Sequence, residues 1–298
     1  MPFLLQFEQM QGCRLYCNAD DMNDLITQTA VFPHLHTRWL GHTYHYFPAI
    51  GSTNSYLKEQ TTLPHGTVAI TDFQVAGRGR FGRIWQAPTK SALLFSVLLH
   101  PNWEAERVAW LGMIAGLAVC EAVAAVVGLE PQIKWPNDVM LRQGETWRKV
   151  CGMLVEAEWG VNDCLANGRL ASAIIGIGLN VNVAATDLPP TGTSLQLAGG
   201  QPVARRLLLC HLLQRLEHRY EAADRGESPQ RDWAEKLVTL GQRVVVTAVH
   251  ATHTPIEGIA EATDPWGQLI VRDTNGHIHI VAAGDVTLRP NNTNHNNL

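Results

Sequence analysis

Three arginines and three glycines fall within seven residues, 77–83 (GRGRFGR), in a chain whose formal net charge is −4. Glycines let the backbone approach a ligand closely and expose its N–H groups. Arginines carry planar, permanently charged groups that suit phosphate or carboxylate. The segment therefore predicts a loop that binds an anionic ligand, although the seven residues alone also fit a solvated basic surface loop.

The same loop contains the pattern G-x-G-x-x-G at Gly77, Gly79 and Gly82, which is typical of dinucleotide-binding folds when a helix follows it. The next residues, 84–88, read IWQAP and open no amphipathic helix, and Pro88 would disrupt one. The N-terminus of that helix holds the pyrophosphate in dinucleotide-binding folds. The sequence therefore disfavours a dehydrogenase.

A second polar cluster, residues 134–138 (KWPND), joins a cation, an amide and a carboxylate on a proline-stiffened segment. Such a set can hold phosphates through Lys134 and a hydrated Mg²⁺ through Asp138. Taken alone, a structural turn explains the cluster equally well.

Two glycine-bearing apolar segments follow. Residues 149–156 (KVCGMLVE) place a lysine before an apolar strand whose glycine permits close approach. Residues 176–182 (GIGLNVN) carry glycines that could admit a flat ring and an asparagine, Asn180, that could hydrogen-bond it. From the residues alone, a core strand is the simpler interpretation of the second segment.

The elements that must position these clusters alternate between helices and strands. Ser52 is a good N-cap for a helix over 53–59, and Gly128 would end a buried, alanine-rich helix over 104–127. Strands are expected at 67–73, 92–99, around Ile133, 150–159 and 171–181, and further helices at 203–225 and 230–240. After Gly241, five short strands (243–249, 256–262, 269–273, 277–282, 286–288) predict a small barrel.

The pattern is typical of an α+β protein, and it suggests four parts. We expect an N-terminal extension (1–45), a catalytic domain (46–240), a small C-terminal domain (241–290) and an asparagine-rich, disordered tail (291–298). The extension shows no clean period. Its histidines are not completed by a carboxylate or cysteine, so an irregular polar lead-in is favoured over a metal site (His34, His36, His42, His45).

Composition restricts the class of protein further. The hydrophobic share of 46% and charged share of 17% are ordinary for a globular protein, and the net charge is not that of a general polyanion binder. The six cysteines include no C-x-x-C pair, which favours a reducing compartment. The N-terminus lacks a basic region, and the longest apolar run, 92–99, is too short for a bilayer. We expect a cytoplasmic, soluble protein with no membrane partner.

The four chemical segments, in this order and spacing, resemble the biotin protein ligase family over residues 47–290. GRGRFGRIW together with KWPND is the most specific part, and Ser52-Thr53-Asn54, Gln74, KVCG, GIGLN and residues 284–289 (GDVTLR) support it. The resemblance implies a class II synthetase-like catalytic domain with a mixed sheet and helices, followed by an SH3-like β-barrel.

The resemblance also implies an activity. Such an enzyme uses ATP and Mg²⁺ to form biotinyl-5′-AMP from biotin, then transfers biotin to a specific lysine of a biotin carboxyl carrier protein. A lipoate ligase shares the fold and the adenylation chemistry, and the GRGR loop followed by Trp85 favours biotin over it. An RNA-binding module is disfavoured, because the C-terminal strands are rich in valine and histidine and carry modest charge.

Roles are carried over residue by residue from the resemblance. Arg80 and Lys149 would be catalytic. Biotin would be held by Ser52, Thr53, Asn54, Gln74, Arg78, Gly79, Arg80, Lys149 and Gly152. ATP would contact Arg78, Arg83, Trp85, Lys134, Asn137, Asn180 and Arg289, with Asp138 on the Mg²⁺ side.

Two departures from the family's pattern lead to further expectations. Ligases that double as repressors carry an N-terminal winged helix, and residues 1–45 lack a helix-turn-helix pattern, so we expect no specific DNA binding. Residues 143–148 suggest a roomy loop before Lys149, although Val150-Cys151-Gly152 keeps that lysine in register. The acceptor carboxylase and a homodimeric state are left open.

Overall fold

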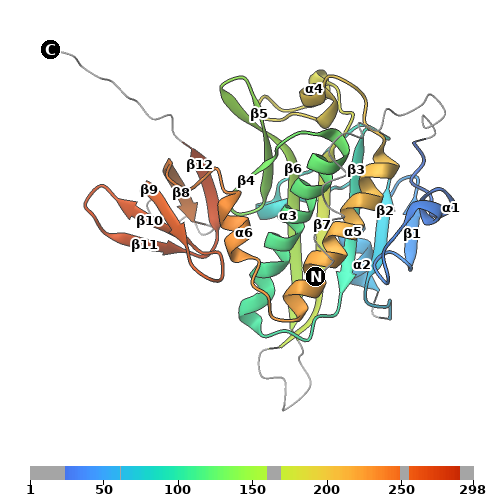
Figure 1. Cartoon of the computed structure of the whole chain (residues 1–298), viewed down its shortest axis with the longest axis horizontal. Coiled ribbons are helices and arrows are strands. Elements are labelled where there is room, and N and C mark those ends of the chain that lie inside the picture. Colours follow the sequence, from blue (N-terminus) through green and yellow to red (C-terminus); the bar gives the residue numbers. More distant parts are fainter. Residues whose placement is uncertain (1–23, 61, 160–168, 249–254, 289–298) are drawn as a thin grey trace, which may run out of the picture.

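The chain's structure is a computed structural model, which describes residues 24–60, 62–159, 169–248 and 255–288. The expected tail at 291–298, most of the expected N-terminal extension and Arg289 lie outside the described residues. The described part contains a large sheet covered by helices and a smaller sheet beside it (Figure 1).

The larger sheet has seven strands in the order β1-β2-β3-β7-β6-β5-β4. β1 runs parallel to β2 and the other neighbouring pairs are antiparallel, so the sheet is mixed. Its strands are β1 (Tyr44–Phe47), β2 (Thr67–Thr71), β3 (Ala92–Leu99), β4 (Gln132–Lys134), β5 (Asp138–Gln143), β6 (Thr146–Trp159) and β7 (Leu170–Asn180).

Helices cover both faces of this sheet. On β3, Phe95 and Val97 join the core that holds α3 (Val108–Val127) and α5 (Arg205–Asp224), whereas Leu98 packs with Leu57 of α2 (Thr53–Glu59). Successive strand residues point to opposite faces. The alternation therefore explains why β3 is buried along its whole length and why its segment is continuously apolar.

The helices begin and end where their local sequence requires. The Ser52 side chain accepts a hydrogen bond from the backbone of Ser55 and caps α2. A 3₁₀ turn (Ala105–Arg107) leads into α3, which ends at Gly128 in the left-handed conformation (φ 72°). Residues 105–127 are long and apolar enough to cross a membrane, but 67% of an apolar 18-residue stretch within them is buried inside the protein, which accounts for its composition.

The smaller sheet is antiparallel throughout, in the order β11-β10-β9-β8-β12. Its strands are β8 (Arg243–Ala248), β9 (Ile256–Thr263), β10 (Leu269–Asp273), β11 (Ile278–Val281) and β12 (Gly284–Leu288). A mixed sheet with helices, followed by this SH3-like unit, confirms the predicted fold class.

The turn between β9 and β10 holds the smaller sheet against the larger one. The rings of Trp266 and Trp110 stack with centroids 6.0 Å apart. The indole of Trp135, within the KWPND segment, donates to the carbonyl of Gly267 at 2.8 Å. Trp233 of α6 (Gln230–Glu235) is buried next to this turn. One of the polar clusters is thus packed directly on the C-terminal unit.

Residues 24–43 are largely irregular in backbone, as expected of the lead-in, but they are packed into the fold rather than forming a separate polar extension. The segment contains α1 (Gln28–Val31), leads into β1, and buries Ile26, Val31 and Leu40 in the main core. Its elements are too short to show a period. They are held instead by distant contacts, since the Glu217 carboxylate of α5 accepts the backbone N–H groups of residues 38–40 at 2.8–3.0 Å.

The histidines of this segment gather no metal ligands. No group of three or more His, Cys, Asp or Glu side chains that could hold a metal occurs within residues 24–60, 62–159, 169–248 and 255–288. His42 instead contacts the carbonyl of Thr37, and His45 contacts the Tyr56 hydroxyl.

The expectation of a roomy loop before Lys149 is wrong. Residues 138–159 form a hairpin of β5 and β6 in which Gln143 pairs with Thr146 across a two-residue turn, with Gly144 at φ 60°. Polar side chains along this exposed end hide the strand pattern in the sequence. The short helix α4 (Leu195–Gly199) was also not predicted.

Replacing Glu217 with alanine tests whether residues 38–40 belong to the fold. Glu217→Ala would leave three backbone N–H groups without their acceptor, and we expect a loss of about 3 kcal/mol of unfolding free energy, measured by urea denaturation. Glu227→Ala, at an exposed carboxylate that pairs with the exposed Arg225, should change the unfolding free energy by less than about 0.5 kcal/mol. Equal stability of the two variants would contradict this role.

Candidate functional site

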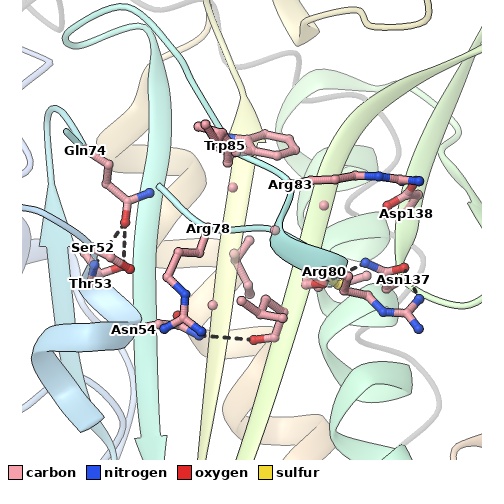
Figure 2. Close-up of a pocket in the computed structure, with 18 of the residues that line it drawn as sticks. Ser52, Thr53, Asn54, Gln74, Arg78, Arg80, Arg83, Trp85, Asn137 and Asp138 are labelled. Atoms are coloured by element: carbon pink, nitrogen blue, oxygen red, sulfur yellow. Dashed lines mark hydrogen bonds between the residues drawn. The ribbon is translucent and has the colours of Figure 1, made fainter. Parts of the chain in front are cut away.

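A pocket opens where the loop after β2 crosses the strands β6 and β7 (Figure 2). One side carries mainly uncharged polar groups, with Arg78 beside Asn54, and the other carries Arg80, Arg83, Lys149 and Asp138. Its lining residues are Ser52, Thr53, Asn54, Gln74, Arg78, Gly79, Arg80, Arg83, Ile84, Trp85, Phe95, Asn137, Asp138, Lys149, Gly152, Met153, Leu154, Gly176, Ile177, Gly178 and Asp285.

The arginine-glycine segment folds as a small hairpin. The backbone of Gly79 donates to Arg83 at 2.8 Å, and that of Trp85 donates to Gly77 at 3.0 Å. A side chain at Gly77 would lie 2.2 Å from the Trp85 carbonyl, so only glycine fits there. The turn itself places Phe81 at φ 57°, a conformation that residues other than glycine rarely adopt. This geometry holds the arginines over the pocket.

Trp85 closes the end of the hairpin by lying on the floor of the pocket. A Cβ added at Gly178 would lie 2.5 Å from its ring, and one added at Gly152 would lie 2.9 Å from it. The two glycines pair with each other across β6 and β7. Their missing side chains therefore create a flat surface that accepts a ring. The indole nitrogen of Trp85 is buried without a hydrogen-bond partner.

The uncharged side of the pocket is a hydrogen-bonded group at the start of α2. Gln74 accepts from the backbone of Thr53 at 2.9 Å. The Thr53 hydroxyl lies 2.6 Å from Ser96, and Ser96 donates to Asn54 at 2.5 Å. Thr53, Asn54 and Ser96 are at most 4% exposed. Buried polar groups with fixed partners suit the recognition of a small polar ligand rather than a bulky chain.

The opposite side concentrates charge. Lys149 and Asp138 form an ion pair at 2.7 Å, and Arg80 donates to the amide oxygen of Asn137 at 3.0 Å. Burial lowers the pKa of both Arg80 and Lys134 from their usual values. A lowered pKa means that the protein disfavours these charges, and for Arg80, which lines the pocket, an incoming anion would relieve a cost already present.

The C-terminal unit reaches this side of the pocket through β12. Arg83 forms an ion pair with Asp285, and Arg80 also contacts the carbonyl of Gly284 at 3.5 Å. Residues that are separated by two hundred positions in the chain thus meet at one site.

Most of the site residues predicted from the sequence lie together. The pocket is lined by Ser52, Thr53, Asn54, Gln74, Arg78, Gly79, Arg80, Arg83, Trp85, Asn137, Asp138, Lys149 and Gly152. Lys134 and Asn180 do not line it, and the Asn180 amide donates to the carbonyl of Thr193. Arg289 lies outside the described residues.

Sequence reasoning missed several residues of the site. Ser96 and Phe95 lie in a strand that reads as pure core, and Asp285 comes from the other sheet. Glu156 ion-pairs with Arg78 at 2.9 Å, and the only signal for it was its place at the end of the KVCGMLVE segment.

The arrangement favours chemistry between bound substrates over covalent attack by the protein. Cys151, beside the pocket, is fully buried, and burial raises its pKa, so its thiolate is not available as a nucleophile. The basic groups that line the pocket can instead draw anions together. The fold and the site thus define an α+β domain built to gather anionic substrates.

Comparison with known proteins agrees with this class. Residues 46–180 match the model of the Biotin/lipoate A/B protein ligase family. The chain is 33% identical to a biotin–[acetyl-CoA-carboxylase] ligase of Mycobacterium tuberculosis over 245 residues, 79% of this chain and 85% of that protein. A ligase of the same name from Paracoccus denitrificans is also 33% identical, over 78% of this chain and 95% of that protein.

A solved structure is similar as well. The biotin protein ligase of Aquifex aeolicus in complex with biotin and ATP aligns with a TM-score of 0.66 and 28% identity, over 83% of this chain and 99% of that one. The chain belongs to the biotin protein ligase family.

A bulkier residue at Gly178 should loosen the arginine hairpin. Gly178→Ala places a methyl group 2.5 Å from the Trp85 ring, so the ring must leave the floor. We expect trypsin to cut after Arg78, Arg80 or Arg83 several-fold faster than in the unmodified protein, measured by mass spectrometry of timed digests.

Gly51→Ala is the matched control, because a Cβ there meets nothing within 4 Å although the residue adjoins the same site. Identical cleavage of the two variants would show that Trp85 does not anchor the hairpin.

Proposed function

We propose that the chain is an ATP-dependent biotin protein ligase that forms biotinyl-5′-AMP and then biotinylates a lysine of a biotin carboxyl carrier protein. The observation that carries the proposal is the two-sided pocket, in which buried neutral groups face a cluster of Arg80, Lys149 and Asp138. The relatives with ligase names and the structure solved with biotin and ATP support it.

The neutral side would bind the head group of biotin. A cyclic urea offers N–H donors and a carbonyl acceptor but no charge, and Ser52, Thr53, Asn54 and Gln74 offer the complementary groups. The Trp85 ring lies on the flat surface that Gly152 and Gly178 leave, and it would form one wall of the head-group site. The valerate carboxylate would then extend toward Arg80 and Lys149.

The cationic side addresses the difficulty of the first reaction. The biotin carboxylate must attack the α-phosphate of ATP, and two anions repel each other. Arg80 and Lys149 would lower that repulsion and stabilise the charge that develops on the leaving pyrophosphate. No protein nucleophile is required, since the substrate carboxylate attacks, and positioning supplies much of the acceleration.

Asp138 and Asn137 would serve the metal side. A carboxylate and an amide oxygen are ligands that suit Mg²⁺, which keeps several waters and binds substrate phosphates. Mg²⁺ bound there would neutralise phosphate charge. Asp138 now pairs with Lys149 at 2.7 Å, so the arrival of ATP would have to redistribute this pair.

The remaining nucleotide contacts are proposed for Arg78, Arg83 and Trp85, which line the pocket. For Lys134 and Asn180 the proposal requires the pocket to extend beyond its present lining when ATP binds. The role of Arg289 rests on the family resemblance alone.

The second reaction requires protection from water. The carrier lysine attacks the mixed anhydride, which water would otherwise hydrolyse. The arginine hairpin covers the pocket and can act as its lid. We place the reaction in the cytoplasm.

Exchange of labelled pyrophosphate into ATP tests the first reaction directly. With ATP and Mg²⁺, exchange should depend on biotin, should not occur with lipoate, and should stop when EDTA removes the metal. Lys149→Ala should lower the exchange rate by a factor of about 100 or more, because a cation at the reacting groups is lost. An unmodified protein that exchanges no label with biotin would contradict the proposed activity.

Removal of Arg80 tests the lid. Arg80→Ala loses the contacts to Asn137 and to the carbonyl of Gly284, so biotinyl-AMP should escape and label bystander proteins, detected by streptavidin blotting. Arg243→Ala, at an exposed arginine paired with Glu257 away from the pocket, is the control. Bystander labelling equal to that of the control would contradict a guarding role for Arg80.

A further inference from the structure

Glu156 stands just outside the lining of the pocket, on β6, with 18% of its side chain exposed. One of its oxygens accepts from Arg78 at 2.9 Å and the other accepts from the amide nitrogen of Asn54 at 2.8 Å. A carboxylate with both oxygens engaged on the site, and with no part in the chemistry described above, needs another explanation.

We propose that Glu156 is a positioning residue that fixes the direction of a buried hydrogen-bond chain and thereby makes Thr53 a hydrogen-bond acceptor for the ring N–H of biotin. The proposal rests on the proposed function and deepens it, because it names the residue that sets the donor and acceptor pattern of the head-group site.

The hydrogen-bond chain begins at the Glu156 carboxylate. An ionised carboxylate can only accept hydrogen bonds, so the amide of Asn54 must turn its NH₂ group toward Glu156. Its oxygen then faces Ser96, and an amide oxygen can also only accept. Ser96 must therefore donate its single hydrogen to Asn54, across 2.5 Å.

The direction is then passed to Thr53. Ser96 has used its hydrogen, so in the 2.6 Å contact with Thr53 it accepts and Thr53 donates. The other acceptor within reach of the Thr53 hydroxyl, Gln74 Oε1, lies farther away at 3.3 Å. With its hydrogen committed to Ser96, Thr53 can offer a ligand only a lone pair, which is what an N–H donor requires.

Burial prevents the hydrogen bonds of this group from reversing their direction. Thr53, Asn54 and Ser96 are 3%, 4% and 0% exposed, so water cannot supply alternative partners. Gly176 makes the arrangement sterically possible, because a Cβ there would lie 2.1 Å from the Asn54 oxygen. The Asn54 NH₂ group has a second acceptor in the Leu154 carbonyl, but this contact is long at 3.5 Å. Without the carboxylate the Asn54 amide could rotate by half a turn, and the Thr53 hydroxyl could then point its hydrogen toward the ring N–H of biotin.

Calorimetric titration of the full chain with biotin and with ATP tests the inference. Glu156→Ala should weaken biotin binding by about 10-fold or more, since hydrogen bonds to a charged partner fix the chain, and should change the Kd for ATP by less than about 2-fold. Glu156→Gln should recover most of the biotin affinity, because its amide oxygen can still accept from Asn54.

A biotin analogue with methylated ring nitrogens tests the direction of the hydrogen bond to Thr53, because it has no ring N–H to donate. The unmodified protein should prefer biotin to this analogue strongly, and Glu156→Ala should show a smaller preference. Glu158→Gln removes a carboxylate on the same strand that is 53% exposed and contacts Lys58 and Ser172, so it serves as the charge control and should behave as the unmodified protein.

Three outcomes would overturn the inference: biotin affinity of Glu156→Ala within 2-fold of the unmodified protein, equal losses for biotin and ATP, or a Gln variant as weak as the Ala variant. Failure of the unmodified protein itself to bind biotin would instead refute the proposed function, so the two failures are distinguishable.

Discussion

Most of the cationic side chains that line the pocket are paired with carboxylates of the protein itself, and this pairing shapes the site. Three cations there each have their own carboxylate partner: Lys149 pairs with an acid of β5, Arg78 with one of β6 and Arg83 with one of β12. Arg80 donates to the uncharged oxygens of Asn137 and Gly284, and burial lowers its pKa although the nearby Asp138 charge acts to raise it. An anion that enters the pocket would therefore offset part of the desolvation of Arg80.

These pairs are partly exposed, and ion pairs of that kind contribute only about 0–1 kcal/mol each. These ion pairs can therefore keep the arginine hairpin over the pocket when no ligand is bound. A phosphate or carboxylate of a ligand can displace them, because it competes for the same guanidinium groups. A site that binds two anions in turn needs such exchangeable partners. In this structure, protein carboxylates pair with the guanidinium groups of Arg78 and Arg83 and with the ammonium group of Lys149.

The two sheets also depend on each other at this point. The turn at residues 264–267 packs on Trp110 and Trp135, and Trp135 belongs to the segment that carries Asn137 and Asp138. The strand β12 touches the hairpin through Gly284 and Asp285. The small sheet therefore packs against the segment that carries Asn137 and Asp138, and it also contacts the arginine hairpin. These contacts explain why a unit that contributes few site residues is joined to the larger domain.

The sequence by itself determined the elements with strong local signals. The buried strand β3, the apolar helix α3 with its terminal glycine, the Ser52 cap and the five C-terminal strands all follow from periodicity, capping and turn chemistry. The motif segments also singled out Arg80, Asn137, Asp138 and Lys149, although the pocket that these residues share is formed by the fold. Each of these features is encoded within a short stretch of chain.

Only the tertiary structure decided the features that depend on distant partners. The elements of residues 24–43 are too short to show a period, and a carboxylate of α5 holds the segment in place. The strand β5 is hidden by the polar residues of an exposed hairpin. Glu156, Ser96 and Asp285 join the site through pairings of strands that are far apart in the chain. A side chain's partner across a sheet depends on strand order and register, and one sequence read along its length contains no direct record of either.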